Sequence, residues 1–332
     1  MNSRIKLTGK KWGPQNLIKM RTPIRLASID IGSNAIRLFV GQNTKSGKVR
    51  VLKDMRASVR LGKDAFTKGY IRPLTLLELE KALKQFRLMC DALRVHHIQA
   101  VGTSALRDSQ NGQKIIKKLH STTGIKVNVI NGVREANLLF RAVTHAVDLQ
   151  NKNALLMDMG GGSLEIVTSQ RGHATGLQSL PLGTVRLLSK VGPKGKYEDY
   201  AQIVRTPLYR LRVQTFGQKS PNSHLLIGTG GNLRALGKLC ERLGLSRSRT
   251  RFSRQNLEVL TLVLFKLTNA QRIKRFQLRK DRADVILPAA VVTLELMRIF
   301  EIETILVPNV GIKNGLFWEG VEKISQQRRR RP

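Results

Sequence analysis

Cysteine is scarce in this sequence. Its 332 residues include only Cys90 and Cys240, and both lie in apolar stretches with helical spacing. Two such cysteines supply neither the disulfide framework of a small secreted domain nor the thiolates of a cysteine-based zinc site. We therefore expect a reducing compartment and a cytoplasmic location, and we interpret Cys90 as a core residue rather than a nucleophile.

Long apolar runs and aromatic residues are also in short supply. No stretch approaches the roughly 18 apolar residues that a membrane-spanning helix needs. The first 25 residues contain seven basic and no acidic residues, but they lack the apolar segment of a secretory signal. Aromatic residues make up 5% of the chain, and no zinc finger, helix-turn-helix or RNP signature is present. These absences predict a soluble protein without a membrane span.

Acidic residues are few. The 22 aspartates and glutamates stand against 59 lysines and arginines, which gives a formal charge of +37 spread over both halves of the chain. Such a charge predicts a polyanionic partner, either a substrate or a nonspecifically bound nucleic acid or anionic surface. We interpret residues 1–23 as a basic, flexible arm and residues 326–332 as a basic tail.

The chain contains one internal repeat. Residues 26–40, with Asp30-Ile-Gly32, align with residues 154–168, with Asp158-Met-Gly160, at an offset of 128 positions. Both segments have the pattern of a strand, an Asp-x-Gly turn and a second strand. The repeat predicts two related α/β domains, residues 24–140 and 141–325, each presenting its glycine turn to a shared cleft.

Between and after the repeats, helical and strand patterns alternate. Thr75, with Glu78 three residues later, predicts a capping box at the start of a helix. The expected strands are 98–101, 125–130, 224–227 and 304–307, and the further helices are 112–120, 134–147, 197–216, 233–243, 255–267, 283–300 and one from residue 311. This order predicts sheets covered by helices.

A basic connector lies between two of the later helices. Ser246-Arg-Ser-Arg-Thr-Arg-Phe-Ser-Arg254 carries four arginines in nine residues. Its composition is compatible with a solvated loop and also with a phosphate-binding segment.

Three glycine turns each follow an apolar strand. They are Asp30-Ile-Gly-Ser-Asn34, Asp158-Met-Gly-Gly-Gly-Ser163 and Gly228-Thr-Gly-Gly-Asn232. Glycine allows several backbone N–H groups to approach one anion, as in a phosphate nest. The aspartates that open two of the turns add the hard oxygen ligands that Mg²⁺ prefers. The three turns together predict a phosphate site with Mg²⁺ as cofactor.

These turns and five further motifs resemble the exopolyphosphatase and guanosine pentaphosphate phosphohydrolase (Ppx/GppA) family, in the order of that family. The further motifs are Arg60-Leu-Gly62, Gly102-Thr-Ser-Ala-Leu-Arg107-Asp, Gly132-Val-Arg-Glu135-Ala, Pro181-Leu-Gly-Thr-Val-Arg186-Leu and Arg282-Ala-Asp284-Val-Ile-Leu-Pro. The resemblance spans residues 24 to 320. It implies two ribonuclease-H-like domains of the actin-like ATPase superfamily that flank a phosphate-binding cleft.

The resemblance also implies roles for particular residues. Glu135 falls on the catalytic glutamate of the family, Asp158 and Glu165 fall on acidic Mg²⁺ positions, and Asp30 occupies the symmetric position in the first turn. The implied phosphate-binding residues are Gly32, Ser33, Asn34, Arg37, Arg60, Arg107, Gly160, Gly161, Gly162, Ser163, Gly228, Gly230 and Gly231.

Three positions depart from the pattern of the family. Arg134 replaces the usual glutamate before Glu135, Ala35 replaces a small hydroxyl residue, and Leu164 replaces threonine or serine. An arginine beside Glu135 is expected to lower the pKa of that carboxyl and to weaken it as a base.

The resulting expectation is a Mg²⁺-dependent hydrolase that releases terminal orthophosphate from inorganic polyphosphate. One alternative is hydrolysis of guanosine pentaphosphate (pppGpp), and another is an inactive homologue that binds nucleic acid or another polyanion through its basic surface. The sequence leaves open which substrate is preferred and whether the protein forms a homodimer.

Overall fold

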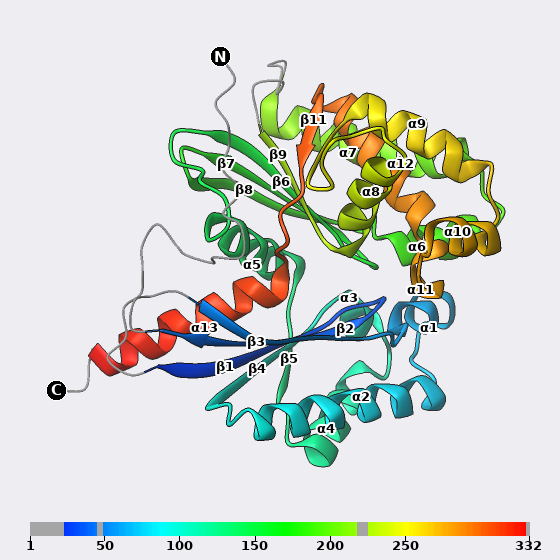
Figure 1. Cartoon of the computed structure of the whole chain (residues 1–332). Coiled ribbons are helices and arrows are strands. Elements are labelled where there is room, and N and C mark those ends of the chain that lie inside the picture. The colour runs from blue at the N-terminus through cyan, green and yellow to red at the C-terminus, as the bar shows by residue number, and fades with distance from the viewer. Residues whose placement is uncertain (1–22, 45–48, 218–224, 330–332) are drawn as a thin grey trace. The chain divides into compact units, whose positions relative to one another are not determined.

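The computed structural model describes residues 23–44, 49–217 and 225–329, which fold into two α/β units (Figure 1). Unit 1 comprises residues 1–148 and 310–332, and unit 2 comprises residues 149–309. Sequence reasoning placed the boundary at residue 140 and kept the chain up to residue 325 in the second domain. The structure divides the chain eight residues later and returns its last helix to unit 1.

Unit 1 is built on a mixed five-stranded sheet with the order β3-β2-β1-β4-β5. Its strands are β1 (Ile24–Ile31), β2 (Ile36–Asn43), β3 (Val49–Ala57), β4 (His97–Gly102) and β5 (Val127–Val129). The chain runs β1 to β3 as an antiparallel meander, and β4 and β5 then add in parallel to β1. Its helices are α1 (Leu61–Lys68), α2 (Pro73–Ala92), α3 (Ser104–Asp108), α4 (Gly112–Thr123), α5 (Gly132–Thr144) and α13 (Ile312–Arg329).

Unit 2 repeats this topology. Its six-stranded sheet has the order β10-β11-β9-β6-β7-β8, in which β6, β7 and β8 form the meander and β9 and β11 add in parallel. The strands are β6 (Asn153–Met159), β7 (Leu164–Gln170), β8 (His173–Leu180), β9 (Leu225–Thr229), β10 (Arg251–Ser253) and β11 (Thr304–Leu306). The helices are α6 (Thr184–Val191), α7 (Tyr197–Phe216), α8 (Gly231–Arg242), α9 (Arg254–Phe265), α10 (Asn269–Phe276), α11 (Lys280–Ala283) and α12 (Ile286–Ile299). The short repeat in the sequence thus marks two sheets of the same strand order.

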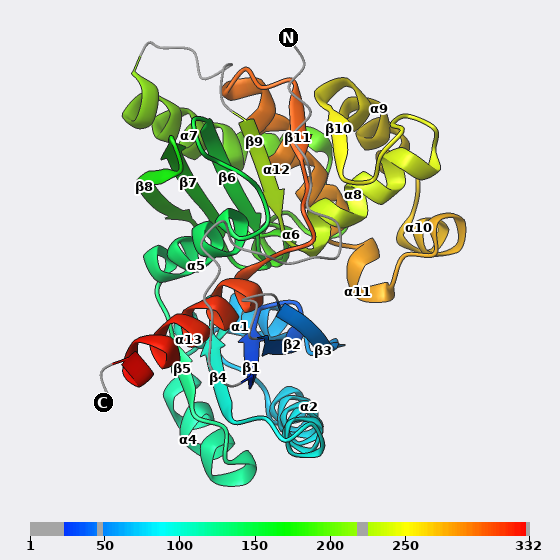
Figure 2. The same cartoon turned by 60° about the vertical axis from the view of Figure 1, so that its left-hand side comes forward.

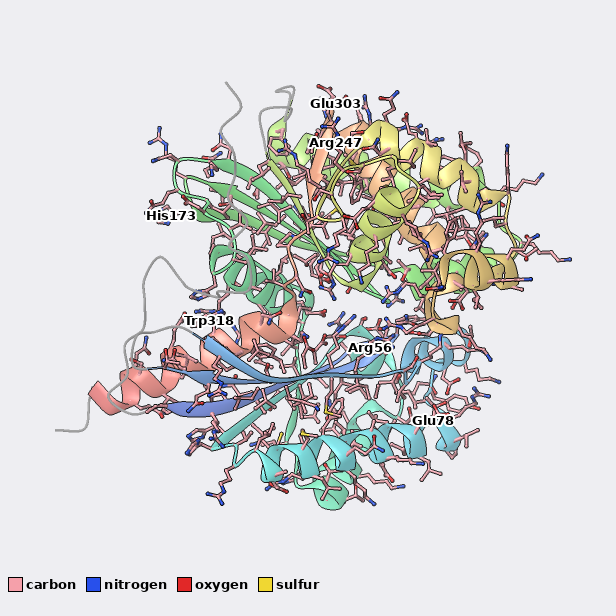
Figure 3. The ribbon with its side chains drawn as sticks, viewed as in Figure 1. Arg56, Glu78, His173, Arg247, Glu303 and Trp318 are labelled. Atoms are coloured by element: carbon pink, nitrogen blue, oxygen red, sulfur yellow. The ribbon has the colours of Figure 1, made fainter. Side chains whose placement is uncertain are left out.

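The last helix, α13, belongs to unit 1 because its apolar face packs on the sheet of that unit. Phe317, Trp318 and Val321 share a core with residues of β1 and β2, and the Phe317 ring packs edge-on against Phe39 at 5.2 Å. A Cβ on Gly315 would lie 1.9 Å from the carbonyl oxygen of Leu138, so only glycine allows α13 to approach α5 this closely. Figure 2 shows α13 beside α5, and Figure 3 labels Trp318, whose ring stacks on His145 at 4.1 Å.

Two local expectations differ from the structure. Helix α2 begins at Pro73, so Thr75 is not its cap; the buried Thr75 hydroxyl instead donates to Asp64 Oδ2 at 2.7 Å. Helix α13 continues through Arg329, so the expected C-terminal tail begins as helix. The expected N-terminal arm lies outside the described residues except for residue 23. No helix in the described ranges has the length and apolar character needed to cross a membrane.

Candidate active site

The predicted residues of unit 1 gather at the carboxyl ends of its parallel strands. Asp30 lies near the end of β1, the segment holding Arg107 follows β4, and Glu135 follows β5. Because β1, β4 and β5 are neighbours in one sheet, their ends share one edge. This edge is where open α/β sheets bind ligands.

The first glycine turn joins β1 and β2. Asp30 and Arg37 are directly opposite each other in the antiparallel register, and Arg37 Nη1 lies 3.2 Å from Asp30 Oδ2. Burial raises the pKa of Asp30, while the Arg37 guanidinium opposes that effect. The structure thus pairs the first aspartate with a cation supplied by its own hairpin.

Ser33 and Gly62 fix this turn to the rest of unit 1. The Gly62 N–H donates to the Ser33 carbonyl at 2.7 Å, and the hydroxyls of Ser33 and Ser104 are 2.9 Å apart. Arg60 directly precedes α1, two residues before Gly62, and Gly32 and Asn34 lie in the turn itself. The turn, the start of α1 and the start of α3 are therefore joined by direct hydrogen bonds.

Glu135 lies in the first turns of α5 and is only 3% exposed. The helix is capped by Asn131, whose side chain accepts the Arg134 N–H. Arg107 Nη1 donates to Glu135 Oε1 and to the carbonyl of Ile130, each at 2.7 Å. A buried carboxylate is therefore held by a guanidinium that is itself anchored to the backbone.

Arg134 points elsewhere. Its guanidinium donates to Glu319 on α13, which also accepts Lys323 Nζ at 2.7 Å. Arg107 is thus the arginine that bonds Glu135. The expectation that Arg134 weakens Glu135 as a base assumed a contact that Arg134 makes with Glu319 instead.

The second glycine turn joins β6 and β7 in unit 2. Asp158 and Glu165 are directly opposite in the antiparallel register, and both are buried. The Thr229 hydroxyl donates to Asp158 Oδ1, and the Ser179 hydroxyl donates to Glu165 Oε1 at 2.9 Å. This hairpin therefore holds two carboxylates at the positions where the hairpin of unit 1 holds a carboxylate and a guanidinium.

The paired carboxylates fit a magnesium ion. Mg²⁺ is commonly held by one or two carboxylates together with water and substrate phosphates. The described residues contain no group of three or more His, Cys, Asp or Glu side chains that could hold a metal by themselves. Asp158 and Glu165 are the two carboxylates that could contribute oxygen ligands to such an ion, whereas Asp30 is paired with Arg37.

Helix α6 holds the glycine turn of unit 2. The N–H groups of Thr184, Val185 and Arg186 donate to the carbonyls of Gly160 and Gly161, and Arg186 Nε donates to Gly162 at 2.8 Å. A Cβ on Gly183 would lie 2.2 Å from the backbone of Gly162, so this contact requires glycine. Ser163 closes the turn by accepting the Gly160 N–H at 3.1 Å.

The third glycine turn joins β9 to α8. Gly228 and Thr229 end the strand, Gly230 adopts a φ of 98°, and Gly231 begins the helix. Asn232 donates to the Thr184 hydroxyl at 3.1 Å and accepts from Arg282. The turn is thereby connected to the one at Gly160.

Sequence reasoning assigned no role to Thr184, Asn232, Thr229, Ser179 or Arg186, which position the predicted residues of unit 2. Thr184, Arg186 and Arg282 lie within motifs that the sequence analysis quoted, and Thr229 and Asn232 belong to the third glycine turn. Ser179 lies on β8, which carried no recognised signal.

Comparison with known proteins identifies this arrangement. The model of the Ppx/GppA phosphatase family matches residues 41–324. The chain belongs to the Ppx/GppA phosphatase family.

Two curated proteins are similar to this chain over most of its length. It is 24% identical over 301 residues to exopolyphosphatase 1 of Mycobacterium tuberculosis, covering 88% of this chain and 87% of that protein. It is 29% identical over 318 residues to the bifunctional 3-dehydroquinate synthase/phosphatase of Fusobacterium nucleatum, covering 89% of this chain. The chain spans only 46% of that second protein.

Solved structures of the family show the same fold. A crystal structure of an exopolyphosphatase from Cytophaga hutchinsonii aligns with a TM-score of 0.81 and 26% identity, covering 90% of this chain and 98% of that one. The Aquifex aeolicus member of the Ppx/GppA family aligns with a TM-score of 0.75 and 24% identity, covering 91% and 99%. The expected α/β class is therefore confirmed, and the chain has the fold of the solved Ppx/GppA structures.

Proposed function

We propose that this Ppx/GppA phosphatase is a Mg²⁺-dependent hydrolase that releases terminal orthophosphate from inorganic polyphosphate. The observation that carries the proposal is the buried Glu135 carboxylate, anchored through Oε1 by Arg107 at 2.7 Å. Relatives named exopolyphosphatases share the fold and most of the chain length. The +37 charge suits a substrate that is itself a polyanion.

In the proposed reaction, a water oxygen attacks the terminal phosphorus and the bond from that phosphorus to the bridging oxygen breaks. Glu135 orients the water and accepts its proton, and the bridging oxygen leaves with the shortened polyphosphate. Because Arg107 holds one carboxylate oxygen, the carboxylate keeps a fixed direction toward the water. Phosphoryl transfer depends mainly on such positioning and on neutralisation of charge.

The glycine turns would supply the phosphate contacts. The carbonyls of Gly160, Gly161 and Gly162 are bound by α6, so the turn is fixed, and its N–H groups other than that of Gly160 would be the donors to an anion. Asp158 and Glu165 would hold Mg²⁺, which neutralises the negative charge of the phosphates. In unit 1, Arg37, Arg60, Asn34 and the turn at Gly32 are the proposed phosphate contacts.

The decisive experiment measures orthophosphate release from long-chain polyphosphate, pppGpp and ATP side by side, with and without Mg²⁺. We expect polyphosphate to be hydrolysed fastest, and we expect Glu135→Gln to lower the rate by about a hundred- to ten-thousand-fold. The matched control is Glu322→Gln, which removes another arginine-paired glutamate: Glu322 lies on α13 and accepts a hydrogen bond from Arg141 on α5. Wild-type rates in Glu135→Gln would refute the role of Glu135.

The same assay separates the two alternatives. Faster release from pppGpp than from polyphosphate would indicate a guanosine pentaphosphate phosphohydrolase. Release from none of the three substrates, together with tight binding of RNA, would indicate an inactive homologue that uses its +37 charge to bind a polyanion.

A further inference from the structure

The basic connector between α8 and α9 is folded so that its side chains alternate. Arg247, Arg249 and Arg251 are exposed, whereas the three hydroxyl residues between and before them, Ser246, Ser248 and Thr250, are partly buried. We call Arg247, Arg249 and Arg251 the arginine comb. The comb places three guanidinium groups on the surface of one short segment.

Hydrogen bonds inside the connector hold this alternation. The Ser246 hydroxyl donates to the Arg251 carbonyl at 2.7 Å and accepts the Ser248 N–H at 3.2 Å. The Ser248 hydroxyl lies 3.0 Å from that of Thr250 and accepts the Thr250 N–H at 3.2 Å. Phe252 then buries its ring in the core of unit 2. The backbone that carries the comb is therefore fixed before any ligand binds.

The comb carries uncompensated charge. Across the described residues, none of its three guanidinium groups has an ion pair or a hydrogen bond. Two carboxylates are nearby: Glu241 accepts the backbone N–H of Arg249 at 3.2 Å, and Glu303 pairs with Arg254. Figure 3 labels Arg247 and Glu303 at the same end of unit 2. Three cations on one held backbone segment favour an anion that carries several charges in a row.

The connector offers cationic charge without an exposed aromatic ring. Proteins that bind single-stranded nucleic acid combine basic residues with aromatic side chains on which bases stack. The aromatic residue of this connector, Phe252, is 2% exposed and offers no face to a base. A chain of bare phosphates needs only the charge and the guanidinium donors that the comb provides.

We propose that the arginine comb is a second binding site for long-chain inorganic polyphosphate, separate from the site of hydrolysis. Its connector packs on the half of α8 away from Gly231: the Ser246 N–H donates to the Cys240 carbonyl, and the Arg249 carbonyl lies against Gly237. We expect a long chain to span the Gly231 turn and the comb, and a short substrate at the turn to leave the comb free. The identity of the ligand rests on the proposed function.

The test compares binding of long-chain polyphosphate and of tripolyphosphate to metal-free protein over a range of salt concentrations. The triple variant R247Q/R249Q/R251Q removes the comb. The control variant K84Q/K114Q/K117Q removes the same charge from exposed lysines of unit 1. Because each phosphate contact contributes about 0.7 to the slope of log affinity against log salt on a flexible strand, loss of the comb should lower that slope by about 2. R247K/R249K/R251K keeps the charge and should retain the slope.

The expected result is weaker binding of long-chain polyphosphate by the triple glutamine variant alone, with binding and hydrolysis of tripolyphosphate unchanged. An equal loss of polyphosphate affinity in the comb and control variants would overturn the proposal, because positive charge anywhere on the surface would then account for the binding. RNA that displaces polyphosphate from the comb at equal charge would also overturn it. If polyphosphate binds the comb but no substrate is hydrolysed, the second site stands and the proposed enzymatic function fails.

Discussion

Replacing Glu165 with glutamine should stabilise the metal-free protein and weaken its stabilisation by magnesium. Asp158 and Glu165 are buried and lie directly opposite each other on β6 and β7. Like charges at such opposite positions destabilise a hairpin by up to about 1 kcal/mol when they are exposed, and by more when they are buried. Glutamine keeps an oxygen that can accept the Ser179 hydroxyl but removes the repulsion. We therefore expect metal-free Glu165→Gln to be more stable than wild type by about 1–3 kcal/mol.

Magnesium should oppose this difference in stability, because it should stabilise wild type more than the variant. An ion that binds only the folded protein stabilises it by about 2.7 kcal/mol at a concentration a hundred times its Kd. Glu165→Gln loses one charged ligand, so its stabilisation at the same Mg²⁺ concentration should be much smaller. The measurement is thermal unfolding in EDTA and across a Mg²⁺ titration, where 1 kcal/mol corresponds to roughly 2–4 °C for a unit of this size.

The hairpin of unit 1 provides the matched control. Arg37→Gln removes the cation that faces buried Asp30, so it should lower the midpoint equally with and without Mg²⁺. A lower midpoint for metal-free Glu165→Gln, or the same Mg²⁺ response as wild type, would refute the assignment of Asp158 and Glu165 as an ion-binding pair.

Two further predictions concern packing and pH. Gly183→Ala places a Cβ 2.2 Å from the Gly162 backbone, so it should displace the glycine turn. We expect the variant to lose about 1–3 kcal/mol of stability and to release phosphate more slowly. An unchanged melting temperature and activity would contradict the close contact. Burial alone would raise the pKa of Glu319 and Glu322, but hydrogen bonds from their cationic partners lower both values below the ordinary 4.5. Both carboxylates therefore stabilise the protein at pH values above 4.5, and this stabilisation is lost as the pH falls through their lowered pKa values. Acid unfolding of E319Q/E322Q should accordingly be less steep than that of wild type.

The repeat was predictable because its information is local. A strand, an Asp-x-Gly turn and a second strand occupy adjacent residues, and the equivalent positions Asp30 and Asp158 lie at equivalent places in two sheets of the same order. The same locality explains why α7 has the predicted bounds. Strand β8 escaped prediction because it forms an exposed edge with few apolar residues, so its pattern carries little hydrophobic periodicity.

Contacts between distant segments could not be predicted in this way. The sequence named Arg107 and Glu135 but gave no sign that they bond each other, because their pairing depends on β4 and β5 lying side by side. Likewise, α13 belongs to unit 1 because it packs on β1 and β2, which lie nearly 270 residues earlier in the sequence. The family resemblance named the candidate site residues, whereas the contacts that hold their side chains are seen only in the folded chain.

The substitution at position 134 illustrates how such a distant contact alters an interpretation. Taken alone, Arg134 next to Glu135 suggests a cation that weakens the catalytic base. Successive residues of a helix point about 100° apart, so Arg134 extends away from Glu135 and toward α13, where Glu319 accepts it. Glu319 is buried and is also bonded by Lys323, so one carboxylate is shared by two cations within unit 1. The cation at position 134 therefore bonds a carboxylate of α13, and Arg107 is a cation that bonds Glu135.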